Sequence, residues 1–152
     1  MGLKIWVDAD ACPKLVKEVL YKAAQNRQVE LLLVANQPLH VPKSPYITSR
    51  QVPAGFDVAD DEIADQVAAG DLVITADIPL ADAVVNKQAI AINPRGTLYT
   101  AENIKGHLQR RDMLEQLRTD GLVSGGPPPF GKKDVQQFAN TLDRELTRAL
   151  KS

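Results

Sequence analysis

The sequence contains one cysteine, two histidines and few aromatic residues, and these shortages exclude several kinds of site. Cys12 has no second cysteine with which to form an internal disulfide, and two histidines are too few for a typical Cys/His zinc site. Aromatic residues make up 5% of the chain, which does not indicate a base-stacking platform for single-stranded nucleic acid. We therefore expect any bound metal ion to be held by oxygen atoms.

Long apolar runs and a strong net charge are also missing. No apolar run approaches the roughly 18 residues of a membrane span, and the N-terminus leads into residues 4–8 without a basic-then-apolar leader. These features predict a cytoplasmic protein with no membrane association. The formal net charge of -1 gives no overall basic footprint, although the second half of the chain carries more basic than acidic residues. This asymmetry permits a polyanionic partner without demonstrating one.

The pattern of apolar residues predicts an α/β fold. At 152 residues and 44% hydrophobic content, the chain suits one domain spanning residues 1–152. Short apolar runs alternate with helical patterns, as expected for βαβ units around a mainly parallel sheet. The predicted strands are residues 4–8, 29–35, 71–76 and 88–92, with a possible edge strand at 46–52. The predicted crossover helices are residues 13–26, the segment around 60–68 and the segment around 80–85.

The C-terminal third has a different character. Residues 100–118 and 132–151 are predicted to be two amphipathic helices. Residues 124–130 join them and contain two glycines followed by three prolines, which predicts a stiff, extended loop after a sharp bend.

Acidic residues follow the first predicted strand. In an open parallel sheet, ligands bind at the carboxyl ends of the strands, so these positions are the first candidates for a site. Asp8 and Asp10 are two residues apart, and in extended backbone both side chains would leave on the same side. One Mg²⁺ or Mn²⁺ ion would remove the repulsion between the two carboxylates. Alternatively, Asp10 caps the helix that begins near Pro13 and Asp8 is simply solvated.

Two further acids precede helical patterns. Asp60 stands three, four and seven residues before Ile63, Ala64 and Val67, and is therefore expected on the core-facing side of its helix. Asp77 has the same relation to the apolar positions that follow it, and it directly follows a strand. Asp60 or Asp61, together with Asp77, would complete the metal site. The alternative is that they are ordinary acids favoured by the dipole at helix N-termini. Asp57 and Asp82 fit a turn or a surface position equally well.

Other polar residues at the strand ends are candidates for substrate contact. Arg95, in a Pro-containing turn after the fourth strand, could hold a phosphate through its guanidinium group, although an ordinary turn explains it equally well. The predicted substrate-binding residues are Asn36, Thr75, Arg95, Lys132 and Lys133.

Several motifs give the chain a family resemblance. Residues 5–13, 57–63, 73–81, 93–96 and 124–127 resemble the YaiI/YqxD family of uncharacterised bacterial proteins, nearly end to end. That family more distantly resembles PIN-like nucleases, which implies a three-layer α/β/α domain with a central sheet of four to five strands. It also implies a Mg²⁺- or Mn²⁺-dependent nuclease acting on RNA or DNA. In this resemblance Asp8, Asp60 or Asp61, and Asp77 bind the metal; a fourth acid has no clear counterpart other than Asp82.

Two other functions remain open. A strand ending in Asp-x-Asp also opens the haloacid-dehalogenase-like phosphatases, in which the first aspartate, here Asp8, is the nucleophile and the second, Asp10, is the general acid/base. The sequence lacks a convincing lysine after a strand, which argues against that function. A non-catalytic regulatory module that binds metal or nucleic acid is the third possibility.

Overall fold

A six-stranded sheet forms the middle of the structure, a computed structural model that describes residues 3–55, 57–122 and 129–151. The strands are β1 (Lys4–Asp8), β2 (Glu30–Ala35), β3 (Ile47–Gln51), β4 (Leu72–Ile74), β5 (Ile90–Ile92) and β6 (Leu98–Tyr99). They lie in the order β3-β2-β1-β4-β5-β6. All neighbouring strands are parallel except β6, which runs antiparallel to β5.

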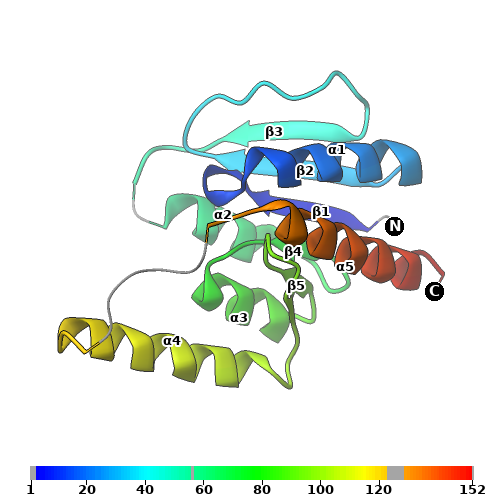
Figure 1. The fold of residues 1–152 in the computed structure, drawn as a ribbon. Helices are drawn as coiled ribbons and strands as arrows, with labels where there is room; N and C mark the ends of the chain where they lie inside the picture. Colours follow the sequence, from blue (N-terminus) through cyan, green and yellow to red (C-terminus); the bar gives the residue numbers. More distant parts are fainter. Residues whose placement is uncertain (1–2, 56, 123–128, 152) are drawn as a thin grey trace.

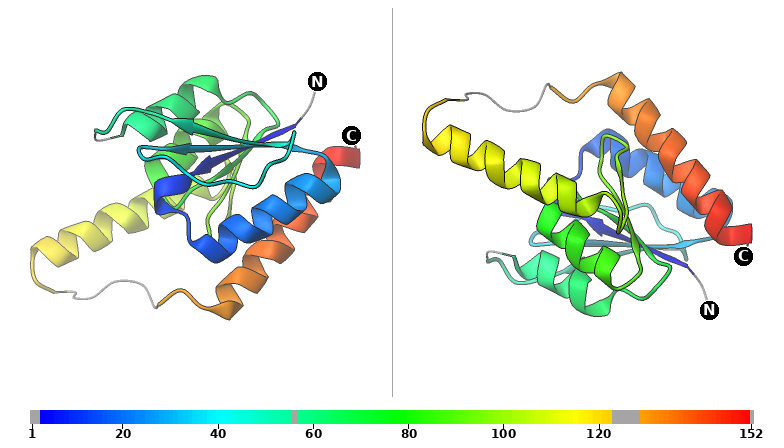
Figure 2. Two further views of the ribbon diagram at one scale, coloured as in Figure 1. Left: turned by 90° about the horizontal axis from the view of Figure 1, so that it is seen from above. Right: turned by 90° about the horizontal axis from the view of Figure 1, so that it is seen from below.

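Helices cover both faces of this sheet (Figure 1). They are α1 (Lys14–Arg27), α2 (Val58–Gln66), α3 (Ile78–Asn86), α4 (Ile104–Thr119) and α5 (Lys132–Lys151). The views from above and below show α1 and α5 side by side on one face and α2 with α3 on the other (Figure 2). The helix α4 lies against α3 and extends beyond it. The arrangement is the predicted three-layer α/β/α fold.

Alternation along the strands divides the core between the two faces. Ile5 and Val7 of β1 pack into the cluster that includes α1 and α5, whereas Trp6 packs into the cluster that includes α2 and α3. The central strands β2 and β4 alternate in the same way, as expected when both faces of a parallel sheet are covered. On α5, Phe138, Leu142 and Leu146 recur every four residues and are fully buried.

The connections change sides between β1 and β4. The helix α1 leads from β1 to β2 across one face, and α2 leads from β3 back to β4 across the other. Strands β1 and β4 are neighbours in the sheet. The helices that follow them, α1 and α3, lie on opposite faces, so the two chain segments separate at the carboxyl ends of these strands. This is the switch point at which open α/β sheets bind their ligands.

The predicted strands and helices are present, and the possible edge strand is confirmed. The edge segment at 46–52 is a strand, β3, parallel to β2. The sheet has six strands instead of four to five, because Leu98–Tyr99 pairs back onto β5 after the turn at residues 93–96. The sequence did not predict β6 because a strand of two residues is too short to show an alternating apolar pattern. Most of the predicted loop at 124–130, namely residues 124–128, lies outside the described residues.

The helix α4 is attached much less closely than α5. All of α4 lies within the described residues 57–122, and its first residue, Ile104, is the one residue of this helix that is buried. Met113 and Leu114 are 57% and 40% exposed. Within the described residues, no helix is both long and apolar enough to span a membrane.

Gly96 fixes the turn before β6 to α5. Its φ of +95° is one that L-residues rarely adopt, and an added Cβ would lie 2.7 Å from the backbone of Gln137. Thr141 of α5 also donates a hydrogen bond to the Gly96 carbonyl at 2.8 Å.

Replacement of Gly96 by alanine should therefore destabilise the fold. We expect Gly96→Ala to lower the free energy of unfolding by about 2–5 kcal/mol, from left-handed backbone strain plus overpacking against α5. Gly70→Ala is the matched control, because Gly70 has a φ of +88° and nothing within 4 Å of an added Cβ. Its loss should be only about 1–2 kcal/mol in urea unfolding. Equal losses in the two variants would contradict close packing at Gly96.

Candidate metal centre

Strand pairing places Asp8 beside Thr75. Val7 of β1 lies opposite Ile74 of β4, so the next residue of each chain segment emerges at the same end of the sheet. The Thr75 hydroxyl donates a hydrogen bond to Asp8 Oδ2 at 3.2 Å. Asp8 is 8% exposed and Thr75 is 1% exposed. The pair forms the buried floor of the candidate site.

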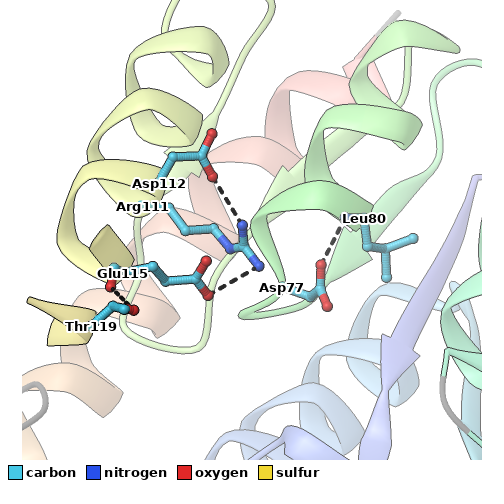
Figure 3. Close-up of polar contacts among 6 residues, drawn as sticks. All are labelled: Asp77, Leu80, Arg111, Asp112, Glu115 and Thr119. Atoms are coloured by element: carbon cyan, nitrogen blue, oxygen red, sulfur yellow. Dashed lines mark hydrogen bonds and ion pairs between the residues drawn. The ribbon is translucent and has the colours of Figure 1, made fainter. Parts of the chain in front are cut away.

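Asp77 is oriented from both sides by its neighbours. Its backbone N–H donates to the Thr75 hydroxyl at 3.0 Å, and its Oδ1 accepts a hydrogen bond from the Leu80 N–H at 2.9 Å as the N-cap of α3 (Figure 3). One carboxylate therefore both caps the helix and faces the site. Asp77 is thus a helix N-terminal acid, as the alternative in the sequence analysis stated, and it also belongs to the acidic cluster.

Asp57, Asp60 and Asp77 converge on one point. Each has a carboxylate oxygen within 4.8 Å of a carboxylate oxygen of the other two. Asp57 is the N-cap of α2 but makes no side-chain cap bond, and its φ of 63° places it in the left-handed region. Aspartate tolerates this conformation better than most residues. The turn thus directs the Asp57 carboxylate to the cluster instead of to the helix.

The crowding of carboxylates changes their protonation. Burial raises the pKa of Asp60 to about 7, reinforced by the negative charges of Asp8 and Asp77, by a hydrogen bond with Asp77 and by the charge of Asp57. The pKa of Asp8 is also raised, mainly by burial, although the bond from Thr75 opposes the shift. Without a cation, the cluster therefore holds a proton near neutral pH that isolated aspartates would release.

These donors suit a hard divalent cation. All three converging groups are carboxylates, and Mg²⁺ and Mn²⁺ prefer oxygen ligands while retaining several waters. A cation would also relieve the repulsion that, after burial, contributes to the raised pKa of Asp60. Asp57, Asp60 and Asp77 are thus the residues that could hold the metal directly.

The cluster opens onto two adjoining hollows. The first, about 310 Å³, is lined by Asp57, Asp60, Asp61 and Asp77 and is called the acidic hollow below. The second, about 520 Å³, lies between the start of α3 and α4 and is called the helix hollow. Asp77, Pro79 and Arg111 line both. Arg111 extends from α4 toward Asp77, while it pairs with Asp112 at 3.2 Å and with Glu115 at 3.5 Å (Figure 3).

Asp10 and Asp61 lie at the margin of the cluster. The extended backbone predicted between Asp8 and Asp10 is wrong, because residues Ala9–Ala11 form a 3-10 helix. Asp10 is exposed, and its Oδ2 accepts a hydrogen bond from the Asn36 N–H at 2.8 Å. It does not cap α1, whose N-cap is Pro13. Asp61 is exposed on α2 and lines the acidic hollow without joining the three converging carboxylates.

The predicted substrate-binding residues are more scattered. Thr75 is buried and positions two acids, so it has no surface to offer a substrate. Arg95 forms an ion pair with Asp134 at 3.1 Å and lies over the Phe130 ring, which ties its turn to the start of α5. Lys132 and Lys133 are exposed at that helix start and line neither hollow.

Asn36 retains one unusual feature. Its Oδ1 is the one buried side-chain nitrogen or oxygen without a hydrogen-bond partner in the part of the chain that the structure describes. The residue follows β2, beside Asp10. It remains a candidate for contact with a polar ligand at this end of the sheet.

Cys12 takes no part in this chemistry. The thiol is 8% exposed, and burial raises its pKa to about 12. A thiolate nucleophile is therefore not available near neutral pH.

Sequence reasoning underestimated two residues. Asp57 looked like a solvated turn residue, because the sequence does not reveal that its left-handed backbone turns the carboxylate away from α2. Arg111 was not singled out, because it lies far along the chain from the acids. The polar pattern of α4 was the available signal: several basic residues occupy the side facing α3.

Comparison with known proteins identifies the relatives of the chain but not its activity. Residues 6–148 match the model of a family described as "Uncharacterized BCR, YaiI/YqxD family". A "UPF0178 protein" of Shewanella amazonensis is 60% identical over 146 residues, covering 96% of this chain and 98% of its own length. Others, from Maridesulfovibrio salexigens and Saccharophagus degradans, are 60% and 57% identical, each covering at least 97% of this chain and 98% of its own length.

No solved structure matches the chain. The motifs that suggested the resemblance are supported by a match over almost the whole length. The chain belongs to the YaiI/YqxD family of uncharacterised bacterial proteins.

Proposed function

We propose that this protein is a divalent-metal-dependent nuclease that hydrolyses phosphodiester bonds of RNA or DNA. The observation that carries the proposal is the convergence of Asp57, Asp60 and Asp77 within 4.8 Å, at the sheet's switch point. Three carboxylates at this spacing are costly unless a cation binds them, and Mg²⁺ or Mn²⁺ suits their oxygen atoms.

The residues divide into two roles. The ion would be held by Asp57, Asp60 and Asp77. The buried Thr75 would orient the site, because its hydroxyl donates to Asp8 and accepts a hydrogen bond from the Asp77 backbone. A bound Mg²⁺ or Mn²⁺ supplies an activated water and neutralises charge on the phosphate. The chain contributes pre-oriented carboxylates: Asp77 is fixed by the N-terminus of α3 and Asp57 by the turn into α2.

The distant resemblance to PIN-like nucleases supports this reaction. The three acids that the resemblance assigns to the metal are Asp8, Asp60 or Asp61, and Asp77. Asp8, Asp60 and Asp77 come together closely enough for the charges of Asp8 and Asp77 to raise the pKa of Asp60. The structure adds Asp57, a fourth acid that the sequence motif did not supply.

The phosphatase alternative has less support. It requires Asp8 to attack a phosphate, yet this carboxylate is 8% exposed, accepts a hydrogen bond from Thr75 and lines neither hollow. Asp10, the residue that would act as general acid/base, interacts instead with the Asn36 backbone. A non-catalytic metal-binding module would differ from a nuclease only in lacking turnover.

Replacement of the converging acids should abolish cleavage. With Mn²⁺ and labelled single-stranded, duplex and structured RNA and DNA, we expect Asp60→Asn and Asp77→Asn to lower the cleavage rate by roughly 100-fold or more. Asp65→Asn is the matched control, because Asp65 is exposed on the same helix as Asp60 and is not one of the converging acids. Undiminished cleavage in both site variants would place the active site elsewhere. Tight Mn²⁺ binding without any cleavage would favour the non-catalytic module.

Asp60→Asn should also change stability in a pH-dependent way. The pKa of Asp60 is about 7 in the folded chain against an ordinary value of 3.8, so the folded state loses stability as pH rises between these values. Without metal, the variant should be more stable than the wild type at pH 8, and this advantage should shrink at pH 5. Saturating Mn²⁺ should reverse the order at pH 8, because only the wild type retains the full ligand set.

Thermal unfolding at both pH values, with and without Mn²⁺, measures these differences. Asp65→Asn should follow the wild type throughout. A wild type more stable than Asp60→Asn in metal-free buffer at pH 8 would contradict the repulsion inferred for the cluster.

Thr75 should act as a positioning residue for the metal site. Thr75→Val keeps the shape of the buried side chain but removes the hydroxyl that donates to Asp8 and accepts from the Asp77 backbone. We expect a 10–100-fold loss of Mn²⁺ affinity in isothermal titration, as is typical when outer-shell partners of metal ligands are removed. Thr75→Ser retains the hydroxyl and should recover most of the affinity. Equally weak binding by both variants would indicate a packing effect instead.

A further inference from the structure

We propose that the helix hollow is a phosphate-binding site, in which Arg111, Arg110 and Arg118 of α4 hold the backbone of a nucleic-acid strand beside the scissile phosphodiester. This inference rests on the proposed nuclease function and deepens it by assigning the substrate contacts. The proposed substrate contacts therefore lie on α4, and not at Arg95, Lys132 and Lys133 as the sequence predicted.

The position of the hollow is the first support. Asp77, Pro79 and Arg111 line both hollows, so a strand with one phosphate at the acidic cluster can place a neighbouring phosphate in the helix hollow. The helix hollow measures about 520 Å³, which is ample for a phosphate and its sugar. Arg111 lines both spaces. Its side chain extends from α4 toward Asp77 (Figure 3).

The composition of α4 is the second support. Positions 107, 111, 114 and 118 fall on one side of the helix, because residues three or four apart are neighbours on an α-helix. On a helix packed against a protein core, this side would normally be apolar. Here it carries His107, Arg111 and Arg118, with Arg110 adjacent, and all four line the hollow. Leu114 is the apolar member of this side, and His107 packs edge-on against the Tyr99 ring at 4.9 Å between ring centroids. The arginines are the residues that packing does not explain.

The existing partners of Arg111 are easily exchanged for a phosphate. Asp112 and Glu115 are surface acids on the same helix, with side chains 69% and 59% exposed. Such exposed pairs contribute little to stability. A phosphate offers the planar guanidinium two oxygens that it can bind in bidentate fashion, and such a contact is stronger than one with a solvated carboxylate.

Charge balance is the third support. The acidic hollow is lined by four aspartates, and a polyanion approaching it meets repulsion that one divalent ion does not fully cancel. The adjoining hollow is lined by three arginines and by two acids, Asp77 and Glu115. The arginines supply the positive charge that a nucleic-acid strand requires near the metal.

The decisive experiment compares opposite changes on α4. Binding is measured by fluorescence anisotropy in Mn²⁺ at several salt concentrations, with RNA and DNA single strands of about 12 nucleotides, a typical site length for single-strand binders. Phosphorothioate linkages keep the strands intact. The variants are Arg111→Gln, Arg118→Gln and Glu115→Gln, with Arg144→Gln as control for the loss of one positive charge. Arg144 is exposed on α5 and lines neither hollow.

We expect Arg111→Gln and Arg118→Gln each to weaken binding roughly tenfold or more, and to lower the slope of log affinity against log salt by about 1. Glu115→Gln should strengthen binding, because it removes the acid that competes for Arg111; a misfolded variant would not bind more tightly. Arg144→Gln should bind the strands like the wild type. Neither arginine variant of α4 should bind Mn²⁺ more weakly than the wild type, because each removes a positive charge.

Two results would overturn the inference in distinguishable ways. If the wild type binds the phosphorothioate strands and cleaves unmodified ones, but the α4 arginine variants lose no more affinity than Arg144→Gln, the phosphate site is wrong and the nuclease function stands. If the wild type binds Mn²⁺ but neither binds nor cleaves either strand, the nuclease function fails and the α4 site fails with it.

Discussion

The parallel pairing of β1 with β4 is the contact on which the acidic site depends. The register that sets Val7 opposite Ile74 brings Asp8 within hydrogen-bonding distance of Thr75, and Thr75 in turn fixes the backbone of Asp77. The helix that follows β1, α1, and the helix that follows β4, α3, pack on opposite faces of the sheet, so the chain separates at the carboxyl ends of these two strands. A shift of this pairing by one residue would move the floor of the site to the other side of the sheet.

That arrangement places Asp8, Asp57, Asp60 and Asp77 close together, although their negative charges repel one another and oppose folding. The pKa of Asp60 is raised first by burial and then by the nearby charges of Asp8, Asp77 and Asp57, so ionised Asp60 is costly to the folded chain. The cost is offset by an extensive apolar core on both faces of the sheet, to which Trp6, Phe138 and the central strands contribute. The acids at this end of the sheet thus lower the stability of the fold while they form the candidate metal site. A bound cation would offset this loss of stability.

Much of this could be predicted from the sequence, because the central strands and α5 carry strong apolar periodicity. The bounds of β1 and α5 agree with prediction to the residue. Asp60 and Asp77 were identified because they precede core-facing residues. The failures have local causes: the 3-10 helix after β1 separates Asp10 from Asp8, and a left-handed turn redirects Asp57. Backbone turns of one to three residues leave no periodic signal, so their side-chain directions become visible only in three dimensions.

The weakly packed α4 gives the mild charge asymmetry of the chain a structural meaning. The net charge of -1 conceals a division in which acids gather at the strand ends and arginines gather on a helix that buries little besides Ile104. A helix with so few buried residues gains little from packing, so its position beside α3 is not explained by the core. Contacts at its start hold it there: Lys105 pairs with Asp82 of α3 at 3.2 Å, and His107 packs edge-on against Tyr99. This placement brings its arginines to the border of Asp77, which also contributes to the acidic cluster. In the proposed function the two charged regions are complementary: the acids would bind a cation, and the arginines would bind the phosphates of the strand beside it.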